Sequence, residues 1–145
     1  MRREVPTVRI IPMSDKAAGF VGRDIVWVQQ EIFLRELPAN GGLYHYQTTG
    51  LNAPPGSILL FQYKAHVIAS AVFLRNERFD RPIDGYGGAL HLDVASIRTF
   101  DPADLTAMCR AWPGMRAFGH VKQYLNPAGY PAFKRRLTNV IKPRD

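Results

Sequence analysis

The strongest constraint on the fold is a pair of β-rich runs in the middle of the chain, separated by only two residues. The runs are 57–63 and 66–73, and Lys64-Ala65 joins them. Two such runs at this spacing predict an antiparallel hairpin with a tight turn, although the turn lacks the usual Asn-Gly or Asp-Gly. We therefore expect the middle of the chain to be β-structure.

Other segments fit strands or helices by the spacing of their apolar residues. The expected strands are 7–12, 43–47 and 89–97, with a break at 85–88. The expected helices are 25–37 with Asp24 as N-cap, one begun by Asp101-Pro102, and a last one opened by Pro131 with Phe133, Leu137, Val140 and Ile141 on one face. Five strands with peripheral helices predict an α+β fold, built on a small curved mixed β-sheet or pseudo-barrel.

Length and composition predict one globular domain over residues 1–145, in which 1–24 form an N-terminal strand and loop. No run approaches the roughly 18 consecutive apolar residues of a membrane span, and residues 1–4 lead into no secretory signal. The single cysteine, Cys109, cannot form an internal disulfide, which is typical of a reducing compartment. We expect a cytoplasmic protein without a membrane partner.

The positive charge of the chain is concentrated in its last quarter. Up to Cys109, eleven Lys and Arg residues balance eleven Asp and Glu residues, whereas from Arg110 onward eight basic residues accompany only Asp145. A local excess of this size can neutralise several phosphates of a polyanion. The alternative is a solvated basic face that aids solubility, and charge alone does not decide between them.

Nothing in the sequence requires an enzyme. The histidines, His45, His66, His91 and His120, show no i,i+4 pair, and phosphate-loop and nucleophile-elbow motifs are absent. We therefore expect no metal site and no cofactor. His91 and Asp93 would share one face of a strand and could hydrogen-bond, a pairing that is commonly structural.

A cluster of aromatic and polar residues is more informative. Tyr44 and Tyr46 alternate along one strand, Phe61 and Gln62 lie on the next, and Trp27 precedes both. Aromatic rings beside amides and hydroxyls are what a site needs to sandwich a flat base and to hydrogen-bond its edge. The alternative is that these rings simply fill the core.

Three stretches carry a family resemblance: Leu43 to Tyr46, Thr48 to Pro54, and 56–63 followed by 66–71. A glycine before an apolar strand that ends in an aromatic, followed by a tight hairpin, resembles the PUA-like superfamily. Its EVE-type branch, related to the YTH, ASCH and SRA domains, is the most similar. The resemblance covers 43–137 and departs at the front, where Trp27 lies in a predicted helix.

The resemblance implies a pseudo-barrel that holds a modified nucleobase in an aromatic pocket. It also implies a partner such as a nuclease or an ATPase in modification-dependent restriction. The expected base-pocket residues are Trp27, Tyr44, Tyr46, Thr49, Phe61, Gln62 and Gln123. The expected phosphate contacts are Lys122, Lys134, Arg135 and Arg136.

Our expectation is thus a binding module for DNA or RNA rather than an enzyme. One alternative is a small enzyme that acts on a nucleotide through His45, His91 or Asp93. Another is a protein-interaction subunit whose aromatic patch meets another chain and which does not bind nucleic acid.

Overall fold

The computed structural model describes residues 5–17, 19–119 and 121–143. Its strands are β1 Val8–Pro12, β2 Leu43–Tyr46, β3 Ile58–Tyr63, β4 His66–Ile83, β5 Tyr86–Ala103 and β6 Gln123–Leu125. Its helices are α1 Ile25–Val28, the π-helix η1 Gln29–Glu36, α2 Leu37–Ala39, α3 Leu105–Ala111, the 3-10 helix η2 Pro127–Gly129 and α4 Tyr130–Arg136. The predicted α+β class is confirmed. No helix within the described parts has the length and apolar character needed to cross a bilayer.

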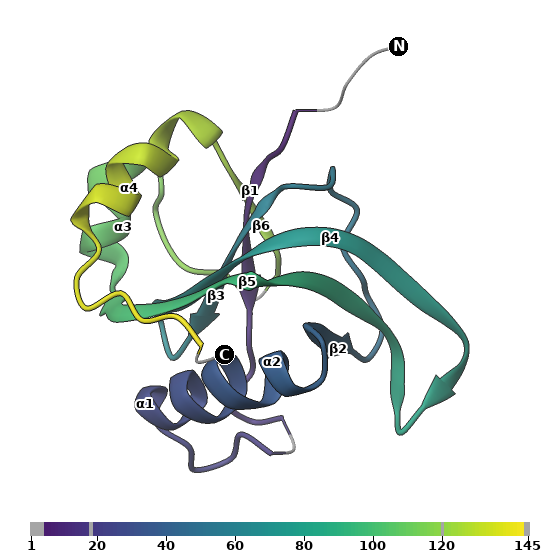
Figure 1. Cartoon of the computed structure of the whole chain (residues 1–145). Coiled ribbons are helices and arrows are strands. Elements are labelled where there is room, and N and C mark those ends of the chain that lie inside the picture. Colours follow the sequence, from purple (N-terminus) through teal and green to yellow (C-terminus); the bar gives the residue numbers. More distant parts are fainter. Residues whose placement is uncertain (1–4, 18, 120, 144–145) are drawn as a thin grey trace.

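All six strands belong to one mixed sheet, in the order β2-β5-β4-β3-β1-β6. β1 and β3 are parallel, and every other pair is antiparallel. In a flat sheet β2 and β3 would lie about 14 Å apart, because neighbouring strands are about 4.8 Å apart. The rings of Tyr44 on β2 and Phe61 on β3 nevertheless have centroids 5.0 Å apart. The sheet is therefore strongly curled, as Figure 1 also shows.

The two faces of the sheet support two hydrophobic clusters. The inner cluster lies inside the curl, beneath the helical segment α1-η1-α2, and it includes Val28, Phe33, Leu37, Leu59, Phe61, Tyr63 and Phe73. The outer cluster packs α3 and α4 on the other face, and it includes Val8, Ile10, Leu60, Phe100, Met108, Trp112 and Phe133. Alternating residues of β3 enter opposite clusters, as the period of two in a strand requires.

The predicted helix over 25–37 is confirmed as one continuous helical segment, and most of its length is a π-helix. Asp24 caps it as predicted and accepts a hydrogen bond from the Trp27 amide at 2.8 Å. The buried residues are Val28, Phe33 and Leu37, so the first two are separated by five positions. The i→i+5 bonding of a π-helix keeps residues at that spacing on one face.

The hairpin at Lys64-Ala65 is confirmed, and both turn residues have positive φ (50° and 60°). The predicted break at 85–88 is confirmed at Gly85 but is shorter than expected, because the 18-residue strands β4 and β5 are joined at Asp84-Gly85 and β5 already begins at Tyr86. Asp84 (φ 53°) and Gly85 (φ 85°) form the Asp-Gly hairpin turn that the sequence reading overlooked. The distal halves of these strands project from the molecule as a ribbon (Figure 1), in which β2 also pairs with β5 from Gly88 to His91.

Two expectations for the end of the chain are corrected, and one strand there was not expected. The N-cap of α3 is Asp104, whose carboxylate accepts from the Ala107 amide, while Asp101 is still part of β5. The last helix ends at Arg136, so the exposed Ile141 does not extend its apolar face and instead bridges Thr99. The short strand β6 was not anticipated.

Candidate functional site

A hollow lies between β6 and the segment that follows α3. Its volume is about 550 Å³, within the range of about 300–1,000 Å³ that small-molecule sites occupy. The residues that line it are Trp112, Gly114, Met115, Arg116, Ala117, Phe118, Gly119, Gln123, Tyr124 and Leu125. Aromatic rings, an amide and a guanidinium therefore meet at one concave surface.

The three aromatic residues of this hollow differ in exposure. Trp112 is buried, and its indole Nε1 donates to the Asn126 carbonyl oxygen at 2.7 Å. Phe118 is half-buried, and Tyr124 is 59% exposed. The Arg9 guanidinium lies 5.3 Å from the centre of the Tyr124 ring, a cation–π contact that steadies the ring. The hollow thus has a fixed indole and a largely accessible phenol.

The side chain of Gln123 braces the loop that borders the hollow. Its Oε1 accepts from the Gly119 amide at 3.3 Å, and its Nε2 donates to the Ala117 carbonyl at 3.4 Å. Both distances exceed the usual 2.7–3.2 Å for N–H···O bonds. A ligand edge that offers one donor and one acceptor could replace these two long hydrogen bonds with little loss of free energy.

Gln62 contacts the same loop from β3. Its Nε2 donates to the Gly119 carbonyl at 3.2 Å, whereas its Oε1 is buried and has no hydrogen-bond partner among the described residues. A buried acceptor without a partner is uncommon in a folded protein. Gln62 and Gln123, both predicted site residues, are therefore brought together around Gly119.

Lys122 and Thr49, two further predicted residues, also contact each other. The Lys122 ammonium donates to the Thr49 carbonyl oxygen at 3.1 Å, although the two residues are 73 positions apart. Partial burial lowers the pKa of Lys122, because the charged form is less well hydrated. This bond joins the loop after β2 to the segment before β6, so Lys122 helps to hold the curled sheet rather than extending freely toward a phosphate.

Phe61 and Tyr44 do not belong to an accessible pocket. Phe61 has no exposed surface, and its ring lies 4.9 Å from that of Phe33 and 5.0 Å from that of Tyr44. Burial raises the pKa of Tyr44 well above its ordinary value of 10, and the neighbouring Tyr86 adds to the shift. Phe61 fills the inner cluster and half-buried Tyr44 packs against it, so the expectation that Phe61 contacts a base is corrected and Tyr44 lies away from the hollow.

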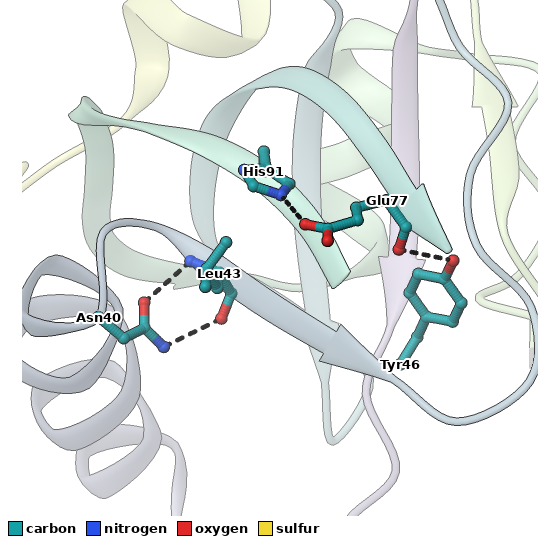
Figure 2. A network of polar contacts seen from close by, with 5 residues as sticks. All are labelled: Asn40, Leu43, Tyr46, Glu77 and His91. Atoms are coloured by element: carbon teal, nitrogen blue, oxygen red, sulfur yellow. Dashed lines mark hydrogen bonds and ion pairs between the residues drawn. The ribbon is translucent and has the colours of Figure 1, made fainter. Parts of the chain in front are cut away.

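Trp27 and Tyr46 also lie away from the hollow. The Arg23 guanidinium covers the Trp27 ring at 4.3 Å from its centre. The Tyr46 hydroxyl donates to the Glu77 carbonyl at 3.3 Å (Figure 2). Tyr46 therefore fixes β2 to β4, and of the predicted base-pocket residues only Gln123 lines the hollow.

The predicted phosphate contacts on α4 remain available. Lys134, Arg135 and Arg136 are exposed and occupy the last turn of the helix. α4 packs on α3, and its last turn lies near the start of that helix, because Arg136 lines a second, smaller hollow together with Asp101 and Ala107. Arg116, which lines the hollow itself, was not among the predicted contacts.

The possible catalytic pairing of His91 with Asp93 is not formed. His91 Nε2 instead lies 2.7 Å from Glu77 Oε1, across the β4–β5 pair (Figure 2). Asp93 accepts from the Ala95 amide at 3.1 Å. Among the described residues no group of three or more His, Cys, Asp and Glu side chains could hold a metal ion, and His120 lies outside those residues.

The sequence reading missed Trp112, Met115, Arg116, Phe118 and Tyr124 as site residues. A signal was present, because Pro113-Gly114 ends a helix and the following stretch mixes aromatic, basic and small residues without strand or helix periodicity. Such a stretch is typical of a loop that carries functional side chains.

Comparison with known proteins finds no family model, no curated protein and no solved structure that matches this chain.

Proposed function

We propose that this chain is a nucleic-acid-binding module that holds a nucleobase in the hollow beside β6. The observation that carries the proposal is the lining of the hollow, where Trp112, Phe118 and Tyr124 surround the Gln123 amide and the Arg116 guanidinium. Stacking of a base on an aromatic ring contributes about 1–3 kcal/mol. The hollow offers rings for the faces of a base and polar groups for its edge.

The amides supply the means of selection in this proposal. Gln123 offers one donor and one acceptor through bonds that are already long, and Gln62 carries a buried acceptor beside the same loop. A base that presents a complementary edge would replace those bonds, and a base that lacks it would leave them unmatched. We also propose that these amides select a modified base over an unmodified one.

Basic side chains supply the affinity for the phosphate backbone. Arg116 lines the hollow, and Lys134, Arg135 and Arg136 lie exposed on α4. Neutralised phosphates release counterions, so affinity should fall steeply as salt concentration rises. This dependence would separate a nucleic acid ligand from an uncharged flat ligand.

The curled mixed sheet also supports, as a proposal, the narrower assignment to a PUA-like pseudo-barrel of the EVE type. The Lys122–Thr49 bond, which joins segments next to the two edge strands, supports closure of the sheet. A role beside a nuclease or an ATPase in modification-dependent restriction follows from that assignment. It is proposed only together with base recognition.

The test is a fluorescence-anisotropy titration with short DNA and RNA oligonucleotides, unmodified or carrying methylated or hydroxymethylated bases. Salt should be about 50 mM and about 200 mM, a range over which phosphate contacts change affinity strongly. Phe118→Ala and Tyr124→Ala should each weaken binding roughly 5- to 150-fold, the equivalent of about 1–3 kcal/mol. Arg135→Ala should weaken binding to all sequences alike and reduce the salt slope by about 1.

Tyr86→Ala is the matched control, because Tyr86 is also an exposed tyrosine but lies at the far end of the ribbon. It should leave affinity unchanged. Circular dichroism should show that each variant keeps the parent fold. If no oligonucleotide binds at either salt concentration, or if Tyr124→Ala binds as tightly as the parent, the proposal is wrong.

A further inference from the structure

The distal ribbon of β4 and β5 is unlike the rest of the sheet because its outer edge is open. β3 pairs with β4 only as far as Val72. Beyond that point, among the described residues, no strand pairs with the far edge of β4 through Ile83, although the Leu51 amide donates to Asn76 Oδ1. The register between β4 and β5 shifts between Arg78 and Ile83, so 79–82 have no paired residue on β5 either. Figure 1 shows this part of β4 and β5 extending away from the helices. An open edge presents backbone donors and acceptors to another strand.

The sequence of this open edge is antisymmetric in charge. Around Phe79, the order is Glu77-Arg78-Phe79-Asp80-Arg81, so each charged position faces the opposite charge when the segment is reversed. All four charged positions lie in β4; Arg78, Asp80 and Arg81 are exposed, whereas Glu77 is half-buried and its Oε1 lies 2.7 Å from His91 Nε2. A segment with this order is complementary to a second copy of itself running antiparallel.

We propose that the ribbon is a self-association arm, in which β4 pairs antiparallel with β4 of a second copy about a two-fold axis at Phe79. Arg78 then lies opposite Asp80 of the second copy, and Glu77 lies opposite Arg81, each pair occurring twice by symmetry. The two rings of Phe79 meet at the axis. Two ribbons joined in this way form a four-stranded sheet, which is more stable in water than an isolated two-stranded hairpin.

The charges also select the register of this pairing. A shift of one residue in one direction places Glu77 opposite Asp80, and the same shift in the other direction places Arg78 opposite Arg81. Both alternatives bring like charges together, which is unfavourable across strands. Edge strands are often protected from pairing by like charges, by proline or by bulges. This edge has Pro82 and a register shift beyond Arg78, but its charges attract in the centred register.

The ribbon also exposes apolar surface that a second copy would partly cover. Leu74 is 45% exposed, Ile83 is 56% exposed and Tyr86 is 37% exposed. With Arg75, Arg78 and Arg81 against Glu77, Asp80 and Asp84, the segment carries no net charge, unlike the basic end of the chain. A strand edge that has no net charge and some apolar surface suits a protein partner better than a polyanion.

A charge-swap series measured by sedimentation velocity over rising protein concentration tests the proposal on the full chain. Arg78→Glu and Asp80→Arg each place like charges opposite one another twice, and each should raise the dimer dissociation constant at least about tenfold. The double variant R78E/D80R restores both pairs and should return the constant to within about threefold of the parent. Lys16→Glu, the same change of charge on an exposed loop, should have no effect.

Cross-linking supplies a second readout. In a Cys109→Ser background, Phe79→Cys should give a disulfide-linked dimer under mild oxidation, because directly opposed Cβ atoms in antiparallel strands are about 4.5–5.5 Å apart. Lys16→Cys should not. A parent chain that is monomeric at every concentration would overturn the proposal. So would a dimer that neither single variant weakens, or a double variant that fails to recover.

Discussion

The two halves of β4 show how one strand can serve two environments. From Val67 to Ala71 every residue is buried, and Phe73, two positions further on, is buried too, because β3 and β5 flank the strand and clusters cover both faces. From Leu74 to Ile83 the strand is mostly exposed, and among the described strands only β5 pairs with it. The difference shows that the sheet's stability comes from packing of the first half, while the second half is free to carry interactions with other molecules.

The largest expected effect comes from removing one aromatic side chain from the packed body of the sheet and one from the ribbon. Phe61→Ala should cost about 3–5 kcal/mol in the free energy of unfolding, because the fully buried ring leaves a cavity in the inner cluster. Phe79→Ala should cost less than about 1 kcal/mol, because the ring is only half-buried on the ribbon. Urea unfolding at a protein concentration that keeps the chain monomeric measures both values. Equal losses would contradict the division between body and ribbon.

The second prediction concerns the packed part of the molecule, whose stability should depend on pH. Burial raises the pKa of Tyr44 above the value near 10 of an unfolded tyrosine. The folded state therefore holds this proton more tightly, and the resulting stability is present below pH 10 and lost as pH rises above it. The loss is at most about 1.4 kcal/mol per pH unit.

Tyr44→Phe removes this proton and tests the effect directly. The difference in free energy of unfolding between pH 8 and pH 11 should be smaller in the variant than in the parent. Tyr63 and Tyr130, whose pKa values burial also raises, remain in both proteins and cancel in the comparison. An unchanged pH dependence would show that Tyr44 ionises in the folded state as readily as in the unfolded one.

The smallest effects compare the two hairpin turns. Ala65 has φ of 60° at the core end of β4, so Ala65→Gly should stabilise the protein by about 0.5–1 kcal/mol once the added entropy of the unfolded chain is subtracted. Gly85→Ala strains a turn with φ of 85°, but that turn lies at the ribbon tip and can open locally. Its effect on global unfolding should be below about 0.5 kcal/mol. A larger loss in Gly85→Ala would mean that the ribbon unfolds together with the body.

The predictable part of this fold is the part in which local pattern and tertiary packing agree. The hairpin at Lys64-Ala65, the cap at Asp24 and the alternation of β3 follow from turn spacing, side-chain chemistry and a period of two. The length of β4 did not follow, because the charged ribbon lacks the apolar content by which strands are recognised. Its Asp84-Gly85 turn was the available signal.

The candidate site was harder to predict than the fold. Phe61 and Trp112 are both buried aromatics, and the spacing of apolar residues alone does not distinguish a ring inside a core from one that lines a hollow. The difference arises from the curl of the sheet, which places Phe61 on its inner face, and from the loop between α3 and β6. Gln123, which was expected from the family resemblance, does line the hollow, where its amide also bonds to Gly119 and Ala117.

The most direct test of the proposed site uses the two tryptophans of the chain as reporters. In a ¹⁵N-labelled protein titrated with the tightest-binding oligonucleotide, the indole N–H signal of Trp112 should shift together with the amides of 114–119 and 123–125. The indole signal of Trp27, whose ring Arg23 covers, should stay in place. A shift of the Trp27 signal with Trp112 unchanged would contradict the account and place the ligand on the helical segment instead.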